Sequence, residues 1–131
     1  MGIALPPMLS GLRVLDLTRN LPGPFATRLL ADLGASIVKV EPPEGDPSRP
    51  LAALFEALNH GKESRCIDFR DATALDQLRS WVAESDVMLD SFRPGVLQGM
   101  GLDAAALHAL NPRLVMVSIT GYGQHGPWAQ R

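Results

Sequence analysis

Three basic side chains stand where the chain leaves or approaches predicted β-strands: Arg19, Lys62 and Arg93. Arginine and lysine supply charge-assisted hydrogen-bond donors, so three of them converging at one edge of a sheet could hold a phosphate-bearing ligand. The same residues could equally be separate, solvated surface charges, and their spacing favours neither interpretation. A phosphate site is therefore a hypothesis that depends on the fold.

The glycine-rich stretch at residues 121–126, Gly-Tyr-Gly-Gln-His-Gly, matches G-x-G-x-x-G and follows a predicted strand. A dinucleotide-binding loop would open a helix and have an acidic residue about 20 positions further on. Here Pro127 follows at once, no helix begins, and no such acidic residue occurs in the sequence. The alternative is a loop whose glycine backbone can lie close to a bound ligand.

Other catalytic motifs are missing from the sequence. The histidines His60, His108 and His125 show no metal-ligand spacing with each other or with Cys66, so no metal is expected. His60 and His125 fall on predicted loops, where a functional role is open for either. No G-x-S-x-G, P-loop or H-E-x-x-H motif occurs. Cys66, beside Ile67 in a predicted strand, is expected to be a small buried thiol.

The composition is that of one globular domain. The chain has 131 residues, 46% of them hydrophobic, with a net charge of -2. This charge predicts no general attraction to nucleic acid or to anionic membranes. No apolar run approaches the roughly 20 residues of a membrane span, and the first residues do not resemble a secretion signal. We therefore expect a cytoplasmic protein without nucleic-acid or membrane partners.

Strand-length apolar runs alternate with helical patterns along the chain. The first helix should begin at Pro24 and end near Gly34, with Phe25, Leu29 and Leu33, together with Leu30, in one apolar stripe. This alternation predicts an α/β fold, a doubly wound, mainly parallel sheet with helices on both faces. Strands are expected at 12–17, 36–41, 65–69, 86–90 and 114–119, and further helices at 51–58, 71–84, 96–100 and 103–110.

Two segments fall outside this alternation. Residues 1–10 are expected to form an extended lead-in, so that the domain occupies residues 11–131. Residues 42–50 contain four prolines and cannot form a regular element. A loop of this length inside a compact domain is usually functional or mobile.

Six motifs occur in an order that resembles one known family. They are Arg-Val-Leu-Asp-Leu-Thr at 13–18, Gly-Pro-Phe-Ala-Thr at 23–27, Ala-Asp-Leu-Gly-Ala at 31–35, Val-Lys-Val-Glu-Pro-Pro at 38–43, Phe-Arg-Pro-Gly-Val-Leu at 92–97 and Ser-Ile-Thr-Gly-Tyr-Gly-Gln-His-Gly-Pro at 118–127. Over about residues 9–131 the chain resembles the class III CoA-transferases, the family of formyl-CoA and carnitine-CoA transferases. By this resemblance, the glycine-rich stretch is the family's closing loop rather than a nicotinamide-binding loop.

The resemblance implies a Rossmann-like domain that binds coenzyme A along the carboxyl edge of its sheet. Two positions depart from the family pattern: the usual Asn-Arg-Asn-Lys-Arg-Ser is Asn-His-Gly-Lys-Glu-Ser at 59–64, and the usual asparagine before Phe92 is Ser91. The residues that match the family's CoA contacts are Asn20, Leu21, Pro42, Leu58, Lys62, Ser91, Phe92 and Met100.

The resemblance also implies a reaction. Class III CoA-transferases move CoA between carboxylic acids through an aspartyl-CoA anhydride, in which an aspartate nucleophile divides the transfer into two steps. Family members are much longer, and this aspartate matches a position beyond Arg131, so no catalytic residue is assigned here. We expect the CoA-binding amino-terminal part of such an enzyme, an incomplete domain that is inactive alone. Two alternatives remain: a fragment of an α-methylacyl-CoA racemase, or a non-catalytic CoA-binding module.

The implied partners are acyl-CoA or CoA and a small carboxylic acid. The family also forms interlocked homodimers in which each chain threads through its partner. A chain that ends at Arg131 lacks the returning segment, so the interlocked form is not expected. Exposed apolar surface and self-association are expected instead.

Overall fold

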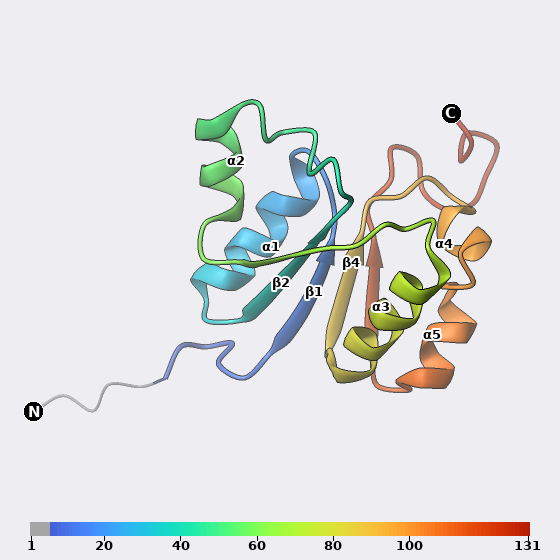
Figure 1. The fold of residues 1–131 in the computed structure, drawn as a ribbon, viewed down its shortest axis with the longest axis horizontal. Helices are drawn as coiled ribbons and strands as arrows, with labels where there is room; N and C mark the ends of the chain where they lie inside the picture. The colour runs from blue at the N-terminus through green and yellow to red at the C-terminus, as the bar shows by residue number, and fades with distance from the viewer. Residues whose placement is uncertain (1–5) are drawn as a thin grey trace, which may run out of the picture.

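The computed structural model describes residues 6–131 as one five-stranded, all-parallel sheet in the order β3-β2-β1-β4-β5 (Figure 1). This confirms the predicted α/β, Rossmann-like fold. The strands are β1 (Arg13–Leu17), β2 (Ser36–Glu41), β3 (Glu63–Cys66), β4 (Val87–Asp90) and β5 (Val115–Ser118). The helices are α1 (Pro22–Asp32), α2 (Ala52–Asn59), α3 (Ala72–Glu84), α4 (Val96–Gly99) and α5 (Ala104–Leu110).

Helices cover both faces of the sheet, α1 and α2 on one side and α3 and α5 on the other (Figure 1). Neighbouring residues of β1 show this division, because side chains of a strand alternate between its faces. Val14 packs in the cluster beneath α1, whereas Leu15 packs in the larger cluster beneath α3 and α5. Right-handed crossovers between parallel strands produce this arrangement.

Strand β1 lies at the centre of the sheet, between β2 and β4. Val14 is in register with Ile37 of β2 on one side and with Val87 of β4 on the other. The strand order therefore reverses direction between β1 and β4. In open α/β sheets, the carboxyl ends of two such strands border the crevice where ligands bind.

The helix ends follow the sequence signals. Asp71 caps α3 by accepting a hydrogen bond from the Thr73 amide, and Asp103 caps α5 by accepting one from the Ala106 amide. Helix α1 begins at Pro22, two residues earlier than expected. It is followed by Gly34, which has a φ of 101°.

The apolar stripe of α1 faces outward, contrary to a simple reading of its helical periodicity. Phe25, Leu29 and Leu33 are 53%, 48% and 44% exposed. Leu30, predicted in the same stripe, instead packs against the sheet with Ala26. Apart from Leu30, the inward-facing residues of α1 are small, which lets the helix lie close to the strands; they include Gly23, Ala26, Thr27 and Ala31.

Strand β3 also differs from the prediction, because it covers 63–66 rather than 65–69. It is an edge strand, so it has a strand neighbour on one side only. The thiol of Cys66 is exposed, and its prediction as a buried core residue was wrong. Ile67, the next residue, is buried.

The predicted lead-in at residues 1–10 lies partly outside the described residues. Within the described part, residues 8–11 form a turn, and the Leu9 amide donates to the Leu33 carbonyl over 2.9 Å. Within residues 6–131, every helix falls short of the length and apolar character needed to cross a lipid bilayer.

Candidate functional site

The turn between β1 and α1 meets the loop after β4 at the carboxyl edge of the sheet. The backbone amide of Arg19 donates to the Ser91 hydroxyl over 2.9 Å. The Arg19 guanidinium carbon lies 5.3 Å from the Phe92 ring centroid and 5.8 Å from that of Phe69. Both distances are within the range of cation–π attraction. Two loops that are far apart in the sequence are thus joined around Arg19.

A groove of about 200 Å³ runs beside this arginine, and its walls come from the loops after β1, β2 and β3. Two guanidinium groups, Arg19 and Arg70, border the groove, and Arg70 is paired with Asp68 over 3.0 Å. Apolar surface comes from Phe69 and from prolines. The residues that line the groove are Arg19, Pro42, Pro43, Glu44, Asp68, Phe69 and Arg70.

The β1–α1 turn has an unusual backbone at Asn20. Its φ of 64° is the only positive value at a non-glycine residue in the described chain. Asparagine tolerates this left-handed region better than most residues. Helix α1 begins immediately beside the turn: a Cβ on Gly23 would lie 2.2 Å from the Thr18 Cβ, so glycine is required there. Asn20 and Leu21 are exposed on the outside of the turn.

Beneath the turn lies a buried ion pair between Lys62 and Asp16, whose side chains are 1% and 0% exposed. Burial lowers the pKa of Lys62, and the charge and hydrogen bond of Asp16 only partly oppose this effect. The other Asp16 oxygen accepts from the Thr18 amide over 2.9 Å. The Lys62 ammonium contacts four acceptors: Asp16 Oδ2 at 3.1 Å, the Pro24 carbonyl at 3.0 Å, Thr27 Oγ1 at 2.8 Å and Asn59 Oδ1 at 2.9 Å.

A second buried pair joins Lys39 of β2 to Asp46 in the proline-rich loop. Lys39 Nζ lies 2.9 Å from Asp46 Oδ2 and also donates to the Thr18 carbonyl over 2.9 Å. Burial alone would raise the pKa of Asp46, but hydrogen bonds from Lys39 and Ser48 lower it below its ordinary value. The Asn20 amide lies 3.4 Å from the other Asp46 oxygen. The loop at 42–50 is therefore fastened to the sheet and to the β1–α1 turn.

The same loop is held at its far end by Glu41 and Arg49. Two nitrogens of the Arg49 guanidinium donate to the two Glu41 oxygens, each over 2.7 Å, and Ser64 adds a hydrogen bond of 2.9 Å. These donors lower the pKa of Glu41 although burial opposes them. The Arg49 guanidinium also lies over the Phe55 ring at 4.3 Å, which connects the loop to α2.

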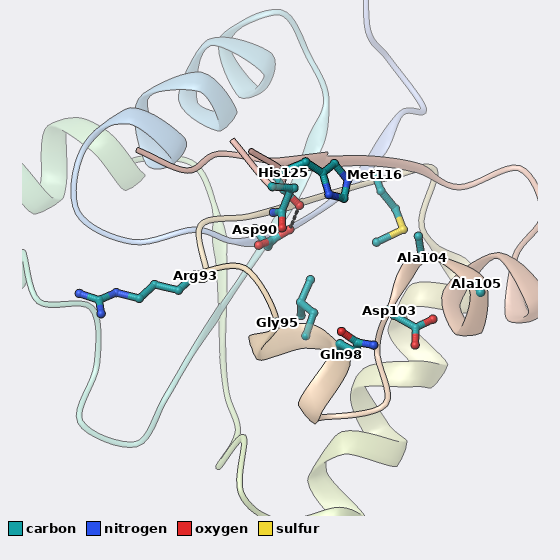
Figure 2. A pocket seen from close by; sticks show the side chains of 12 residues that line it. Asp90, Arg93, Gly95, Gln98, Asp103, Ala104, Ala105, Met116 and His125 are labelled. Carbon is teal, nitrogen blue, oxygen red and sulfur yellow. Dashed lines mark hydrogen bonds between the residues drawn. The ribbon is translucent and has the colours of Figure 1, made fainter. Parts of the chain in front are cut away.

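A cavity of about 540 Å³ lies beyond the carboxyl ends of β4 and β5 (Figure 2). Figure 2 shows Asp90 and His125 on one side of the cavity and Gln98 and Asp103 on the other, while Arg93 extends away. Asp90 is 1% exposed. Burial raises its pKa, although the Ser118 hydroxyl and the Phe92 amide both donate to the carboxylate. The lining residues are Asp90, Arg93, Gly95, Leu97, Gln98, Asp103, Ala104, Ala105, Met116, Ser118, Gln124 and His125.

The structure brings together part of the predicted site. Pro42, Ser91 and Phe92 surround Arg19, and Asn20 follows it in the turn. The remaining predicted residues divide by burial: Leu21 is exposed, Met100 is half-buried, and the side chains of Leu58 and Lys62 are buried. The cavity of Figure 2 is lined by none of the eight predicted residues.

The three basic residues considered at the outset have different environments. Arg19 borders the smaller groove, Lys62 is buried in an ion pair, and Arg93 extends from the rim of the larger cavity. Sequence reasoning missed Arg70 and the buried partner Asp46. The sequence signal for buried charges was the presence of Asp16 and Lys39 within otherwise apolar strands.

The arrangement is suited to binding an extended, partly anionic ligand. Guanidinium groups and aromatic rings lie together at the edge, whereas the buried carboxylates of Asp16, Asp46 and Asp90 are engaged in internal hydrogen bonds. Among residues 6–131, no cluster of three or more histidine, cysteine, aspartate or glutamate side chains could hold a metal ion.

Comparisons with known proteins agree with this fold. The chain is 39% identical over 133 aligned positions to the probable fatty acyl-CoA transferase Rv3272 of Mycobacterium tuberculosis, covering 94% of this chain and 34% of that protein. It is 40% identical to the succinate–glutarate CoA-transferase of Agrobacterium fabrum, with the same coverages. The crystal structure of a CAIB/BAIF family protein from Brucella suis matches with a TM-score of 0.93 and 42% identity, covering 97% of this chain and 37% of that one.

The chain spans about a third of the length of the curated relatives it matches. A model of CoA-transferase family III matches residues 9–131, which is nearly the whole sequence. Sequence, fold and relatives therefore agree, and the chain belongs to CoA-transferase family III.

Proposed function

We propose that this chain is the CoA-binding part of a family III CoA-transferase, which moves CoA between carboxylic acids through an aspartyl-CoA anhydride. The observation that carries the proposal is the junction of the β1–α1 turn with the β4 loop around Arg19, at the point where the strand order reverses. The residues proposed to form the CoA site, either by contact with CoA or by holding the site in shape, are Asn20, Leu21, Pro42, Leu58, Lys62, Ser91, Phe92 and Met100.

The chemistry of this edge suits coenzyme A. Arg19 and Arg70 can donate charge-assisted hydrogen bonds to phosphate groups, and the rings of Phe69 and Phe92 offer apolar surface to an adenine or a pantetheine chain. The β1–α1 turn and the β4 loop, which carry Arg19 and Phe92, are joined by a hydrogen bond before any ligand arrives. A site that is already ordered loses less conformational entropy on binding.

We assign no catalytic nucleophile to the carboxylates near the site. Asp16 and Asp46 are each paired with a buried lysine, and Asp90 accepts hydrogen bonds from Ser118 and Phe92. A nucleophilic carboxylate must be free to attack the acyl carbon, whereas these three are buried and already accept internal hydrogen bonds. The role proposed for this chain is therefore to bind and orient CoA. The transferase names of the relatives support this reaction over that of an α-methylacyl-CoA racemase.

Calorimetric titration with CoA tests the proposal. We expect micromolar affinity, about -8 kcal/mol, and weaker binding of pantetheine, which lacks the nucleotide. Arg19→Gln should weaken CoA binding by about tenfold, because it removes a charged donor that faces the groove. Arg113→Gln, an exposed arginine before β5, is the matched control and should bind as the wild type does. A wild-type chain that shows no heat of CoA binding would overturn the proposal.

A further inference from the structure

The Lys62 ammonium has no donor left for a ligand. An ammonium carries three N–H donors, and four protein acceptors already lie within 3.1 Å of Lys62 Nζ. The side chain is 1% exposed. For Lys62 to contact a phosphate, the ammonium would have to leave these acceptors. The Asp16 carboxylate would then be buried without a cationic partner, which costs folding free energy.

The bonds of Lys62 lead to the β1–α1 turn. One carboxylate oxygen of Asp16 accepts a hydrogen bond from the Lys62 ammonium. The other accepts a hydrogen bond from the backbone amide of Thr18, the first residue of the turn. The Thr18 carbonyl in turn accepts from Lys39, whose partner Asp46 lies 3.4 Å from the Asn20 amide. Two buried lysine–aspartate pairs thus hold residues 18–20 from the inside.

This turn has a conformation that needs support. Asn20 has a left-handed backbone, and Gly23 lies so close to Thr18 that the turn cannot move inward. The outer side of the same turn presents Arg19 to the groove and leaves Asn20 exposed beside it. A change in the backbone at Thr18 would therefore displace the ligand-facing groups.

We propose that Lys62 is a positioning residue: acting through Asp16, it holds the β1–α1 turn in the shape that receives the ligand and does not itself touch a phosphate. This inference rests on the proposed CoA site for its functional consequence. The Lys62–Asp16 link to the turn is a property of the chain without any ligand.

The two possible roles of Lys62 predict opposite effects of removing Asp16. If Lys62 contacted a phosphate, Asp16→Asn would remove a competing negative charge and CoA would bind more tightly. If Lys62 positions the turn, Asp16→Asn breaks the same link as Lys62→Met, and CoA binds more weakly in both variants. The salt dependence of CoA binding also distinguishes the two roles of Lys62. Loss of a phosphate contact would make CoA affinity less sensitive to salt, whereas loss of a positioning residue would leave that sensitivity unchanged.

The experiment compares Lys62→Met, Asp16→Asn and the double variant, which leaves no unpaired charge in the interior. Amide NMR shifts of Thr18, Arg19 and Asn20 are recorded without ligand, and CoA affinity is measured by calorimetry at about 50 and 500 mM salt. We expect shifted turn amides in all three variants and CoA binding weakened about tenfold or more, with the salt dependence of the wild type. Arg28→Met is the control, because Arg28 joins α1 to the Ala57 carbonyl from the exposed side without reaching the turn.

Several results would overturn the inference: tighter CoA binding by Asp16→Asn, a reduced salt dependence in Lys62→Met, or unshifted turn amides in the double variant. If both single variants fail to fold, the double variant gives both readouts. If the wild type does not bind CoA, the proposed function fails, and the ligand-free amide shifts still decide whether Lys62 holds the turn.

Discussion

Lys39 Nζ and Asp46 Oδ2 lie 2.9 Å apart, and their side chains are 2% and 0% exposed. Lys39 belongs to β2, whereas Asp46 lies in a loop whose prolines exclude regular structure. The pair therefore fastens an irregular segment to β2, an inner strand of the sheet. Its loss should be felt in the stability of the whole domain.

Lys39→Met should destabilise the domain by about 3–5 kcal/mol, because it leaves the Asp46 charge buried without its partner. Urea unfolding followed by circular dichroism measures this difference. The exposed pair between Arg70 and Asp68 provides the control, and Arg70→Met should cost less than about 1 kcal/mol. Equal losses in the two variants would show that burial does not set the strength of the Lys39 pair.

Glu41 and Asp46 should make the domain sensitive to acid. Their pKa values lie below the ordinary 4.5 and 3.8, because hydrogen bonds to Arg49, Lys39 and Ser48 outweigh the effect of burial. A lowered pKa in the folded state adds stability above the ordinary value, and this stability is lost as the pH falls through the folded pKa. The urea concentration at the midpoint of unfolding should therefore decrease as the pH is lowered below about 5. In Glu41→Gln this decrease should be smaller. An unchanged slope in that variant would contradict the assignment.

Asp90 should have the opposite pH dependence. Burial raises its pKa, although the Ser118 hydroxyl and the Phe92 amide favour the charged form. Because the pKa of Asp90 is raised in the folded state, the contribution of Asp90 to folding stability is fully present below the ordinary pKa. This contribution is lost as the pH rises through the folded pKa. Asp90→Asn keeps the shape without the charge, so its stability relative to the wild type should increase with pH, reaching about 1 kcal/mol. A constant difference between pH 4 and pH 8 would exclude this explanation.

Gly23 and Gly99 allow a comparison between a crowded and an open glycine position. A Cβ on Gly23 would lie 2.2 Å from the Thr18 Cβ, whereas a Cβ on Gly99, in α4, would meet nothing within 4 Å. Gly23→Ala should cost about 1–3 kcal/mol or more, because α1 must move away from the turn. Gly99→Ala should be neutral or stabilising by about 0.4–1 kcal/mol, because alanine has less backbone freedom in the unfolded chain. Thermal melting of both variants makes the comparison.

The outward stripe of α1 should cause self-association. Leu29 is 48% exposed between Phe25 and Leu33, whereas Leu30, one residue later, packs against the sheet. Leu29→Glu should reduce association without loss of stability, because apolar surface on the outside promotes contacts between molecules. Leu30→Glu should instead destabilise the fold. Sedimentation and urea unfolding measure the two effects, and a wild-type chain that remains monomeric at high concentration would exclude the association.

The fold could be predicted from the sequence because its signals are local. Apolar runs of strand length, the capping residues Asp71 and Asp103, and the prolines in the first turn of α1 each have an effect within a few residues. The orientation of α1 could not be predicted from its hydrophobic periodicity. The face of α1 that packs closely against the sheet consists mainly of small residues, and most of its large apolar side chains lie on the opposite face.

The candidate site was less predictable because it depends on contacts between distant segments. The resemblance identified residues on loops at the carboxyl edge of the sheet, and the structure places Ser91 and Phe92 against Arg19. A residue type alone could not distinguish a surface lysine from a buried one. Lys62 is separated from its partner Asp16 by 46 residues, so only the fold shows that the two are paired.

The central position of β1 has a consequence for synthesis on the ribosome. A growing chain can assemble β1, β2 and β3 with their helices as soon as Cys66 has emerged, and the pair between Lys62 and Asp16 can then close. The other edge of β1 awaits β4, which begins beside Asp86, 73 residues after Arg13. During that interval β1 is an open strand edge, the kind of surface that pairs with other chains. A pause in translation that delays the emergence of β4 would keep this edge of β1 open for longer and would therefore favour aggregation.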